Sequence, residues 1–270
     1  MKMEQAKELA EKAVAELAES LEQGHSEGLK KYLAALAKFP RYSLNNILLI
    51  LAQRPETTRV AGYATWKELG RRVNRGAKGI LIFAPIVRRK PEQSDSEEIS
   101  ANARSVKLVG FRGVHVFAEE DTTGQPLPRL SSCSGEPSAF VDRLRQFVTD
   151  RGIQLEYSES IRPAQGQCSA SKITLLPGMD SAVEFSVLAH EVGHHLLHFG
   201  DRRTETTKRV RETEAEAVAF VVSQAIGLEA ISSASEYISL YSGDKTLLVE
   251  SLEHIQGVSA EIISAITAPD

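Results

Sequence analysis

The chain has 270 residues, of which 42% are hydrophobic, 25% charged and 6% aromatic, and its formal net charge is −4. This composition is typical of a globular protein with one large or two medium cores. No apolar run approaches the roughly 18 to 20 residues of a membrane helix, and acidic residues stand where a secretory signal needs an apolar core. We therefore expect a soluble, cytoplasmic protein with no membrane partner. Two cysteines, Cys133 and Cys168, are too few for a disulfide framework, and we expect free thiols.

The charge is distributed unevenly along the chain. Residues 41–90 contain eleven Lys and Arg residues and two Glu residues, a net charge of +9, which leaves −13 for the rest of the chain. A basic segment joined to an acidic remainder predicts an anionic partner for the basic half alone.

Three helices are predicted at the start of the chain. Residues 5–21 carry one apolar stripe with Glu and Lys opposite, and glycines follow it. A second helix over residues 29–38 ends before Pro40, because the residue before a proline avoids helical geometry. A third helix begins near residue 42 or 43 and runs through residue 51 to Pro55.

Strands are predicted in the segment that follows. Residues 80–84 form a buried strand that ends at a proline, and residues 107–117 form its partner, with a polar loop over residues 91–105 between them. A short helix before these strands carries Trp66, the single tryptophan of the chain. We assign residues 1–128 to one α+β module.

Residues 129–270 are assigned to a second module. Strands are predicted at residues 153–157 and 172–176. Besides the helices described next, its predicted helices cover residues 138–150, 235–240 and 245–263.

Residues 180–200 are predicted to form a single helix with a signal at each end. Ser181 and Glu184 have the spacing of a capping box at the N-terminus. Gly200 follows the last periodic residue, where a left-handed position favours glycine.

This helix contains the motif His190-Glu191-x-x-His194. A spacing of four residues puts both imidazoles on one face, one turn apart, where they can bind one metal ion. Glu191 then lies beside the ion, in the place of a general base that takes a proton from the attacking water. A metzincin would need a histidine where Gly200 stands, so that class is excluded. A chance match is the alternative, and the apolar flanks of the motif argue against it.

A helix predicted over residues 209–222 offers the third ligand. Glu212 and Glu216 are four residues apart and share a face, whereas Glu214 points elsewhere. One of the pair can bind the metal while the other supports a ligand histidine. We expect Glu212 to be the ligand, Glu216 to support it and the ion to be Zn²⁺, with the reverse assignment of the two carboxylates left open. The alternative is that these residues are solvated helix charges.

The histidine motif followed by Glu212-x-x-Ala215-Glu216-x-Val218-Ala219 resembles the ImmA/IrrE type of minimal zinc peptidase domain. The resemblance implies a gluzincin-like domain in which the first glutamate of the second helix is the third zinc ligand. This chain has Glu216 where that family has Asn or Asp, and Val218 where it has Phe. In zincins an edge strand just before the metal helix lies along the cleft, where an extended peptide can add, and residues 172–176 take that place.

A second group of motifs lies in the basic half. It comprises Tyr42-Ser43-Leu44-Asn45-Asn46, Gly62-Tyr63-x-x-Trp66, Gly70-Arg71-x-Val73-x-x-Gly76-x-Lys78-Gly79 and the later Gly110-Phe111 and Val116-Phe117 pairs. Together these motifs resemble the N-terminal domain of ArdC-type antirestriction proteins. That family joins a single-stranded-DNA-binding domain to a C-terminal metallopeptidase-like domain, so the resemblance implies single-stranded DNA as the anionic partner.

Contacts to DNA are expected from basic, amide and aromatic side chains of this segment. Basic groups follow the phosphates, and aromatic rings stack on bases. The candidates are Arg41, Tyr42, Asn45, Asn46, Trp66, Arg71, Arg75 and Lys78. For Trp66, a place in the core is an equally good interpretation.

The resemblances imply a single-stranded-DNA-binding antirestriction-type protein with a zinc metallopeptidase domain. Such a protein would protect mobile DNA or hydrolyse a DNA-associated protein. Two other functions fit the same sequence. One is a regulatory zinc protease that cleaves a repressor-type protein, and the other is a DNA-coating protein whose zinc is not catalytic.

Overall fold

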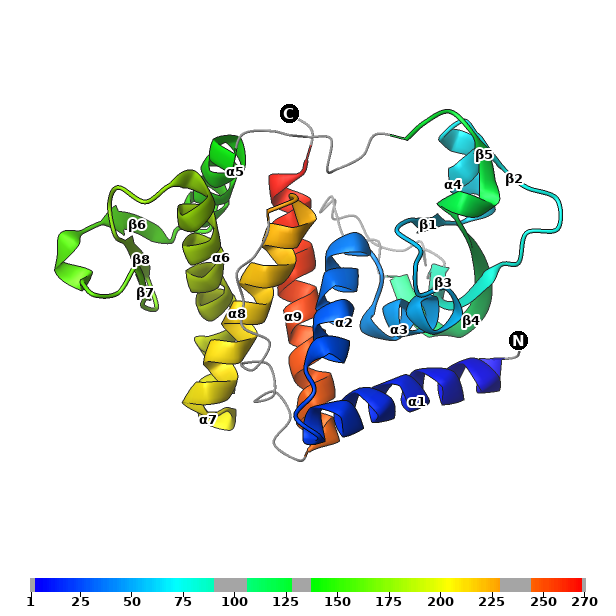
Figure 1. Ribbon diagram of the computed structural model, residues 1–270, viewed down its shortest axis with the longest axis horizontal. Helices are drawn as coiled ribbons and strands as arrows, with labels where there is room; N and C mark the ends of the chain where they lie inside the picture. Colours follow the sequence, from blue (N-terminus) through cyan, green and yellow to red (C-terminus); the bar gives the residue numbers. More distant parts are fainter. Residues whose placement is uncertain (1–2, 90–105, 128–136, 229–243, 269–270) are drawn as a thin grey trace, which may run out of the picture. The chain divides into compact units, whose positions relative to one another are not determined.

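The computed structural model describes residues 3–89, 106–127, 137–228 and 244–268 (Figure 1). Helices and antiparallel strands are mixed along the chain, which confirms the α+β fold class. The chain forms two compact units. Unit 1 contains Met1–Ala10 and Leu49–Gly124, and unit 2 contains Glu11–Leu48 and Gln125–Asp270.

The units differ from the modules expected at residues 1–128 and 129–270 in one segment. Residues 11–48 group with unit 2, because helix α2 (Glu27–Lys38) packs against α8 (Lys208–Ala225) and α9 (Lys245–Ile266). The Nε2 group of Gln256 on α9 also donates a hydrogen bond to the carbonyl oxygen of Tyr42 over 3.0 Å. This grouping depends on contacts between distant parts of the chain, so local sequence patterns do not reveal it.

A three-stranded antiparallel sheet in the order β1-β4-β3 forms the centre of unit 1. Its strands are β1 (Val60–Ala61), β3 (Ile80–Arg89) and β4 (Val106–Ala118). Strand β3 runs five residues beyond the end expected at Ala84. Pro85 is tolerated there because β3 is an edge strand, where a residue without an N–H group breaks no pairing on the open side.

Unit 1 also contains a smaller two-stranded pairing of β2 (Arg71–Val73) with β5 (Thr122–Gly124), entered through helix α4 (Tyr63–Glu68). A short 3-10 helix, Glu119–Asp121, leads from β4 into β5. Figure 1 shows α4, β2 and β5 close together.

Both sequence segments of unit 1 contribute to its core. Ala6 and Ala10, from the start of helix α1 (Met3–Glu22), pack with Leu49 of helix α3 (Leu44–Gln53) and Leu81 of β3. All four side chains are buried. Helices α1 and α3 each begin in one unit and end in the other.

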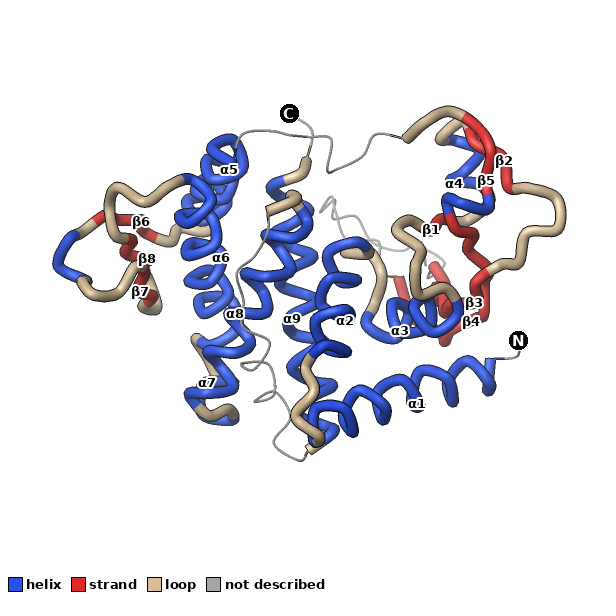
Figure 2. Tube along the Cα trace, viewed as in Figure 1, coloured by secondary structure: helices blue, strands red, loops and turns tan. Residues whose placement is uncertain are grey.

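Unit 2 is built mainly from helices, drawn in blue in Figure 2. Helix α6 packs against α5 and α8, and α8 packs in turn against α9 and α2. The bounds are α5 (Pro137–Asp150), α6 (Ser181–His198), α7 (Arg202–Glu205), α8 (Lys208–Ala225) and α9 (Lys245–Ile266). The buried faces of these helices form one apolar core, from Leu144 of α5 to Ile262 of α9.

A small sheet in the order β6-β8-β7 lies against α6. Strand β6 (Gln154–Tyr157) pairs parallel to β8 (Lys172–Leu175), and β7 (Gly166–Cys168) pairs antiparallel to it. The expectation that residues 172–176 form an edge strand is therefore wrong, because β8 is the central strand. Strand β7 occupies the edge, and its sequence Gly-Gln-Cys lacks the β-branched, alternating pattern that marks a strand.

The start of α6 differs from the expected capping box. Asp180 is the N-cap residue, and Glu184 makes no capping hydrogen bond. Its carboxylate instead accepts hydrogen bonds from Arg145 of α5 (Nη2 to Oε1, 2.6 Å) and from the hydroxyl of Tyr157 (2.5 Å). The capping-box prediction is wrong, because a largely buried carboxylate binds most strongly to a charged partner from another element.

Three sequence predictions lie outside the described residues: the loop at 91–105, the helix at 235–240 and the thiol of Cys133. The predicted helices at 5–21, 29–38, 138–150 and 245–263 correspond to α1, α2, α5 and α9. Among the helices that the structure describes, none is both long and apolar enough to span a membrane.

Candidate metal centre and nucleic-acid interface

Helices α6 and α8 lie in close contact at Gly193, in the middle of the histidine motif. A Cβ atom at this position would lie 3.2 Å from the Cα of Ala215 and 3.3 Å from the Cβ of Val218. The absence of a side chain at Gly193 therefore lets the two helices pack tightly. This packing brings His190 and His194 of α6 beside the glutamates of α8.

His190, His194 and Glu212 form a three-residue cluster with the composition of a metal site. Their ligand atoms all lie within 4.8 Å of one another. The Glu212 Oε2 atom lies 3.3 Å from the Nε2 of His194 and 3.7 Å from the Nε2 of His190. The cluster thus brings together the three residues expected from the sequence to bind the ion.

The protonation of this cluster shows how strongly it attracts positive charge. Burial alone lowers the pKa of His190, but hydrogen bonds that its imidazole donates to Glu212 and Glu216 outweigh burial and raise the pKa to about 9. Burial and the neighbouring His190 lower the pKa of His194 to about 4. Hydrogen bonding to His190 lowers the pKa of Glu212 to about 2. The Glu212 carboxylate thus stabilises a proton on His190, while His194 stays neutral. A metal cation bound between these side chains would be stabilised by the same negative charge.

Glu216 approaches the cluster from the other side of His190. Its Oε2 lies 3.4 Å from the Nδ1 of His190, whereas Glu212 contacts the Nε2 atoms of both histidines. This geometry fits Glu212 as a ligand and Glu216 as the carboxylate that orients His190.

A buried chain of polar groups supports His194, and the sequence did not reveal it. The Nδ1 atoms of His194 and His198 lie 2.9 Å apart, and the Nε2 of His198 lies 2.9 Å from the Oε2 of Glu214. Glu214 is fully buried, and its carboxylate forms an ion pair with Arg202 of α7. Arg202 also donates to the hydroxyl of Ser251 on α9 (3.3 Å).

This series of hydrogen-bonded side chains determines which nitrogen of each imidazole carries a proton. An ionised Glu214 accepts the Nε2–H of His198, which leaves the Nδ1 of His198 as an acceptor. The Nδ1 of His194 must then be the donor between the two rings, so its Nε2, the atom that faces Glu212, has a lone pair free for a metal.

Glu191 is buried beside the cluster, with 7% of its surface exposed. Burial and the charge of Glu212 raise its pKa to about 7, against the opposing effect of His190. Strand β7 passes very close to it: a Cβ atom at Gly166 would lie 2.6 Å from the Glu191 Oε1. Glycine at this position therefore lets the edge strand lie next to the carboxylate.

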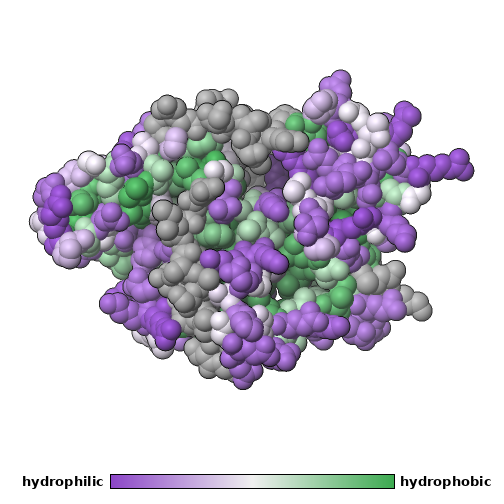
Figure 3. All heavy atoms as spheres, in the orientation of Figure 1, coloured by the Kyte–Doolittle hydropathy of each residue, from purple (hydrophilic) through white to green (hydrophobic). Residues whose placement is uncertain are grey.

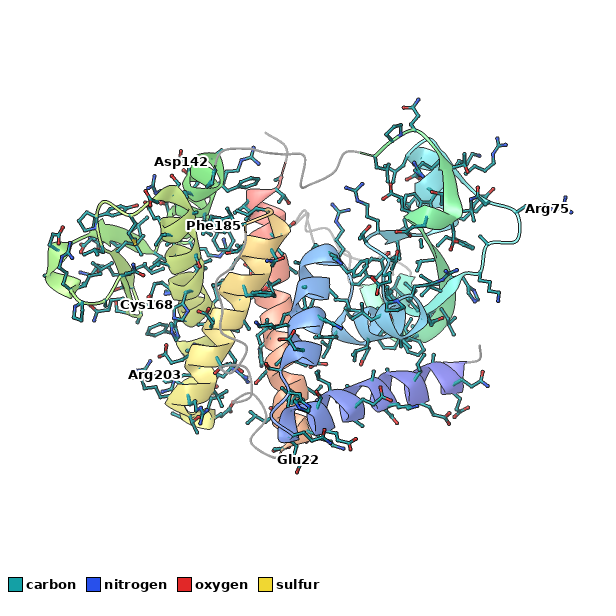
Figure 4. The ribbon with its side chains drawn as sticks, in the orientation of Figure 1. Glu22, Arg75, Asp142, Cys168, Phe185 and Arg203 are labelled. Carbon is teal, nitrogen blue, oxygen red and sulfur yellow. The ribbon has the colours of Figure 1, made fainter. Side chains whose placement is uncertain are left out.

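An open cleft of about 580 Å³ gives access to these groups. The edge strand β7, the histidine motif and the start of α8 line it. Figure 4 labels Cys168 and Arg203, which contribute to this lining from β7 and α7. Cys168 is a free thiol, as expected, and burial together with the nearby Glu191 raises its pKa to about 12. The thiol therefore stays protonated and is not a nucleophile.

Unit 1 has a basic hollow of about 710 Å³ at the α4, β2 and β5 region. Its basic side chains come from Lys67, Arg71, Arg72 and Arg75. Tyr63 also lines it and is 59% exposed. The surface of this region is mostly hydrophilic in Figure 3, and Figure 4 shows Arg75 extending away from the ribbon. An exposed ring among basic groups has the composition of a single-strand binding surface.

Trp66 is a core residue, so the prediction that it contacts DNA is wrong. It is only 1% exposed, and its indole Nε1 donates to the carbonyl oxygen of Phe117 over 3.0 Å. Arg71 also has a structural role, because its guanidinium donates hydrogen bonds to the hydroxyl and carbonyl oxygens of Thr122.

The remaining DNA candidates are not gathered at this hollow. Lys78 is exposed on unit 1, but it does not line the hollow. The other four candidates lie just before or at the start of α3 and belong to unit 2. Arg41 and Asn45 are exposed, Tyr42 is half-buried and Asn46 is buried. Burial of Asn46 disfavours a direct contact to DNA.

Comparison with known proteins gives the family of the first half. A family model described as the N-terminal domain of the anti-restriction factor ArdC matches residues 5–117. Residues 5–117 are therefore similar to the ArdC N-terminal domain. This finding confirms the resemblance derived from the motifs between Tyr42 and Phe117.

Solved structures extend the similarity of the ArdC-like chain beyond that domain. The metal-free crystal structure of the antirestriction ArdC protein from plasmid R388 has a TM-score of 0.53 and 17% sequence identity, and the match covers 96% of this chain and 97% of that one. The Mn(II)-bound structure of the same protein has a TM-score of 0.48 and 17% identity, covering 97% and 99%. No curated protein sequence matched the chain. The metal-free structure therefore shows that an ArdC-like fold extends over both units.

The sequence analysis of the ArdC-like chain did not predict the partner of Glu214. Glu214 points away from the cleft, as its spacing predicts, and toward His198 in the interior. The spacing of His194 and His198, one helical turn, was an available signal. Tyr63 and Lys67 are likewise one turn apart, which places both on the outer face of α4 while Trp66 faces the sheet.

Proposed function

We propose that this ArdC-like chain is an antirestriction protein that binds single-stranded DNA through unit 1 and hydrolyses peptide bonds at a zinc centre in unit 2. Unit 2 is then a minimal gluzincin-like peptidase domain. The observation that carries the proposal is the His190, His194 and Glu212 cluster at an open cleft with a buried glutamate, Glu191, next to it.

The spacing of the donor atoms supports zinc. Two donors that each lie about 2 Å from a tetrahedral zinc ion are about 3.3 Å apart. The separations of 3.3 Å and 3.7 Å from Glu212 to the two imidazoles are close to this value. Two nitrogens and one oxygen form a ligand set that zinc accepts, and three protein ligands leave a position for water in a catalytic site.

The ion, when bound, supplies Lewis acidity that makes water a better nucleophile and polarises the substrate carbonyl. Residues of the chain transfer the proton and position the peptide. Glu191 lies buried beside the cluster and lines the cleft, where its carboxylate can accept a proton from the attacking water. The same carboxyl group then gives this proton to the leaving amine nitrogen. The edge of β7 offers backbone groups with which an extended peptide can pair.

Openness of the site favours a catalytic over a purely structural role. Structural zinc sites are closed by four protein ligands, whereas catalytic sites keep one position accessible. The Glu212 side chain is 51% exposed, and the cleft reaches all three candidate ligands.

The DNA-binding part of the proposal rests on the basic hollow of unit 1. Four basic side chains and an exposed tyrosine ring line it, which suits phosphates and an unpaired base. A duplex offers no free base face for the ring, so we expect preference for single strands. DNA bound there would bring the peptidase to proteins that act on the same strand.

The Glu191→Gln variant tests the catalytic part. Amide nitrogen and oxygen cannot accept the proton, so hydrolysis of a denatured protein substrate should fall by about 10²- to 10⁴-fold, while zinc content and oligonucleotide binding stay unchanged. The same variant is then assayed for protection of unmodified DNA in a restricting host. Unchanged hydrolysis would remove Glu191 from the mechanism, and full protection without hydrolysis would point to a DNA-coating protein.

A further inference from the structure

Three basic side chains form one wall of the metal cleft. They are Arg203 of α7 and Lys208 and Arg211 of α8, and we call them the basic wall. They line the same cleft as the metal cluster, Glu191 and the edge strand β7. A substrate that reaches the metal centre therefore passes close to them.

The basic wall has no acidic partner in the part of the chain that the structure describes. Arg211 donates through Nη1 alone, to the carbonyl oxygens of Arg203 (3.0 Å) and Thr206. Arg203 lies over the ring of Phe199, with its guanidinium carbon 5.7 Å from the ring centroid. Its neighbour Arg202, by contrast, is paired with buried Glu214. The carbonyls and the ring hold the two guanidinium groups in place without neutralising them.

The basic residues of the wall on α8 lie where positive charge destabilises a helix. Lys208 is the first residue of α8, and the first turn contains no acidic residue. The positive end of the helix dipole lies there, and basic side chains are disfavoured at that end. Residues that break a local preference without a compensating partner in the fold are expected at functional sites.

We propose that the basic wall binds an acidic side chain of the peptide that is cleaved at the metal centre. The inference rests on the proposed peptidase function, and it adds the class of substrate: segments with Asp or Glu near the scissile bond. A peptide carboxylate fits better than a nucleic-acid backbone, because Glu191 and Glu212 line the same cleft and repel a run of phosphates. Hydrogen bonds between a guanidinium and a carboxylate also add directional selectivity.

Binding is measured by fluorescence anisotropy with the full-length, zinc-loaded Glu191→Gln protein, which cannot consume the peptide. The probes are labelled decapeptide mixtures with Glu fixed at one position, each compared with the same mixture carrying Gln there. Arg203→Gln and Lys208→Gln are combined in the test variant. Arg209→Gln is the control for the substitution on α8, because it removes one positive charge from the same turn as Lys208 but does not line the cleft.

We expect at least one Glu mixture to bind about tenfold more tightly than its Gln counterpart, as a charged hydrogen bond implies. The preference should disappear in the test variant and persist in the control. Equal binding of Glu and Gln mixtures, or a preference that survives in the test variant, would overturn the inference. Loss of affinity for a (dT)₁₂ oligonucleotide without loss of the Glu preference would also overturn it, in favour of a nucleic-acid contact.

Cleavage by the zinc-loaded wild-type protein separates the inference from the proposed function. Cleavage that depends on Glu191 but shows no preference for acidic peptides supports the peptidase and refutes the basic wall. A Glu preference in binding without cleavage of any mixture supports the wall as an acidic-peptide site and refutes the peptidase.

Discussion

The imidazole of His194 is constrained on both of its nitrogens. Its Nε2 faces the carboxylate of Glu212, and its Nδ1 faces His198, which leads on to buried Glu214 and Arg202. The orientation and tautomer of a candidate ligand therefore depend on residues that never reach the cleft. Polar groups of this kind commonly affect metal affinity almost as much as the ligands themselves.

Glu214→Gln should weaken zinc binding by about 10- to 100-fold, because an amide holds His198 less firmly than a carboxylate does. The measurement is a calorimetric zinc titration of the metal-stripped full-length protein, with circular dichroism to confirm that the variant is folded. Glu205→Gln, an exposed site on α7, is the control and should bind zinc normally. A folded Glu214→Gln protein with wild-type affinity would show that the buried chain is only structural.

Strand β7 depends on the missing side chain of Gly166 to lie next to Glu191. Gly166→Ala would place a Cβ atom 2.6 Å from Glu191 Oε1 and 2.8 Å from the Cγ1 of Val187. Either the carboxylate or the strand must move, so we predict a fall in peptide hydrolysis of at least about tenfold with little change in zinc affinity.

The control for this variant is Gly257→Ala on α9, where an added Cβ meets nothing within 4 Å. It should keep full hydrolysis, since alanine is the better helix former. Equal hydrolysis by Gly166→Ala and the wild-type protein would mean that β7 does not position Glu191.

The α4, β2 and β5 region makes a separate prediction about DNA. Tyr63→Ala should lower the affinity for single-stranded DNA by about 5- to 150-fold, which corresponds to about 1–3 kcal/mol for one stacked base. Arg75→Gln should reduce the slope of log affinity against log salt by about 0.7, one phosphate contact. Fluorescence anisotropy over a salt series measures both.

Leu69→Ala is the matched control for Tyr63, since Leu69 is exposed at the end of α4 but does not line the hollow. Its affinity should equal that of the wild-type protein. If Tyr63→Ala also binds like the wild type, the hollow is not a stacking site, and the exposed residues of unit 2 such as Arg41 become the better candidates.

Side chains that share one face of a helix through their spacing were predictable from the sequence. His190, Glu191, His194 and Glu212 come together as expected, because helical spacing places them on facing surfaces of α6 and α8. Contacts between distant elements were not predictable. Strand β7 has no strand-like pattern, the partners of Glu214 lie on α7 and α9, and Trp66 is buried by β4.

At the scale of the whole molecule, we propose one ligand for each of the two compact units. Zinc binding should stabilise unit 2 by about 2.7 kcal/mol at a free zinc concentration one hundred times the dissociation constant. Single-stranded DNA should instead act on unit 1. The division matters because residues 5–117, which match the ArdC N-terminal domain model, include helix α2 of unit 2.

Hydrogen exchange of the full-length protein, measured by mass spectrometry alone, with zinc and with single-stranded DNA, tests this assignment most directly. We predict that zinc slows exchange in α6 and α8, and that DNA slows exchange in α4, β2 and β5. Unchanged exchange of α6 and α8 with zinc would contradict the metal centre. Protection by DNA that misses α4, β2 and β5 would contradict the proposed binding surface.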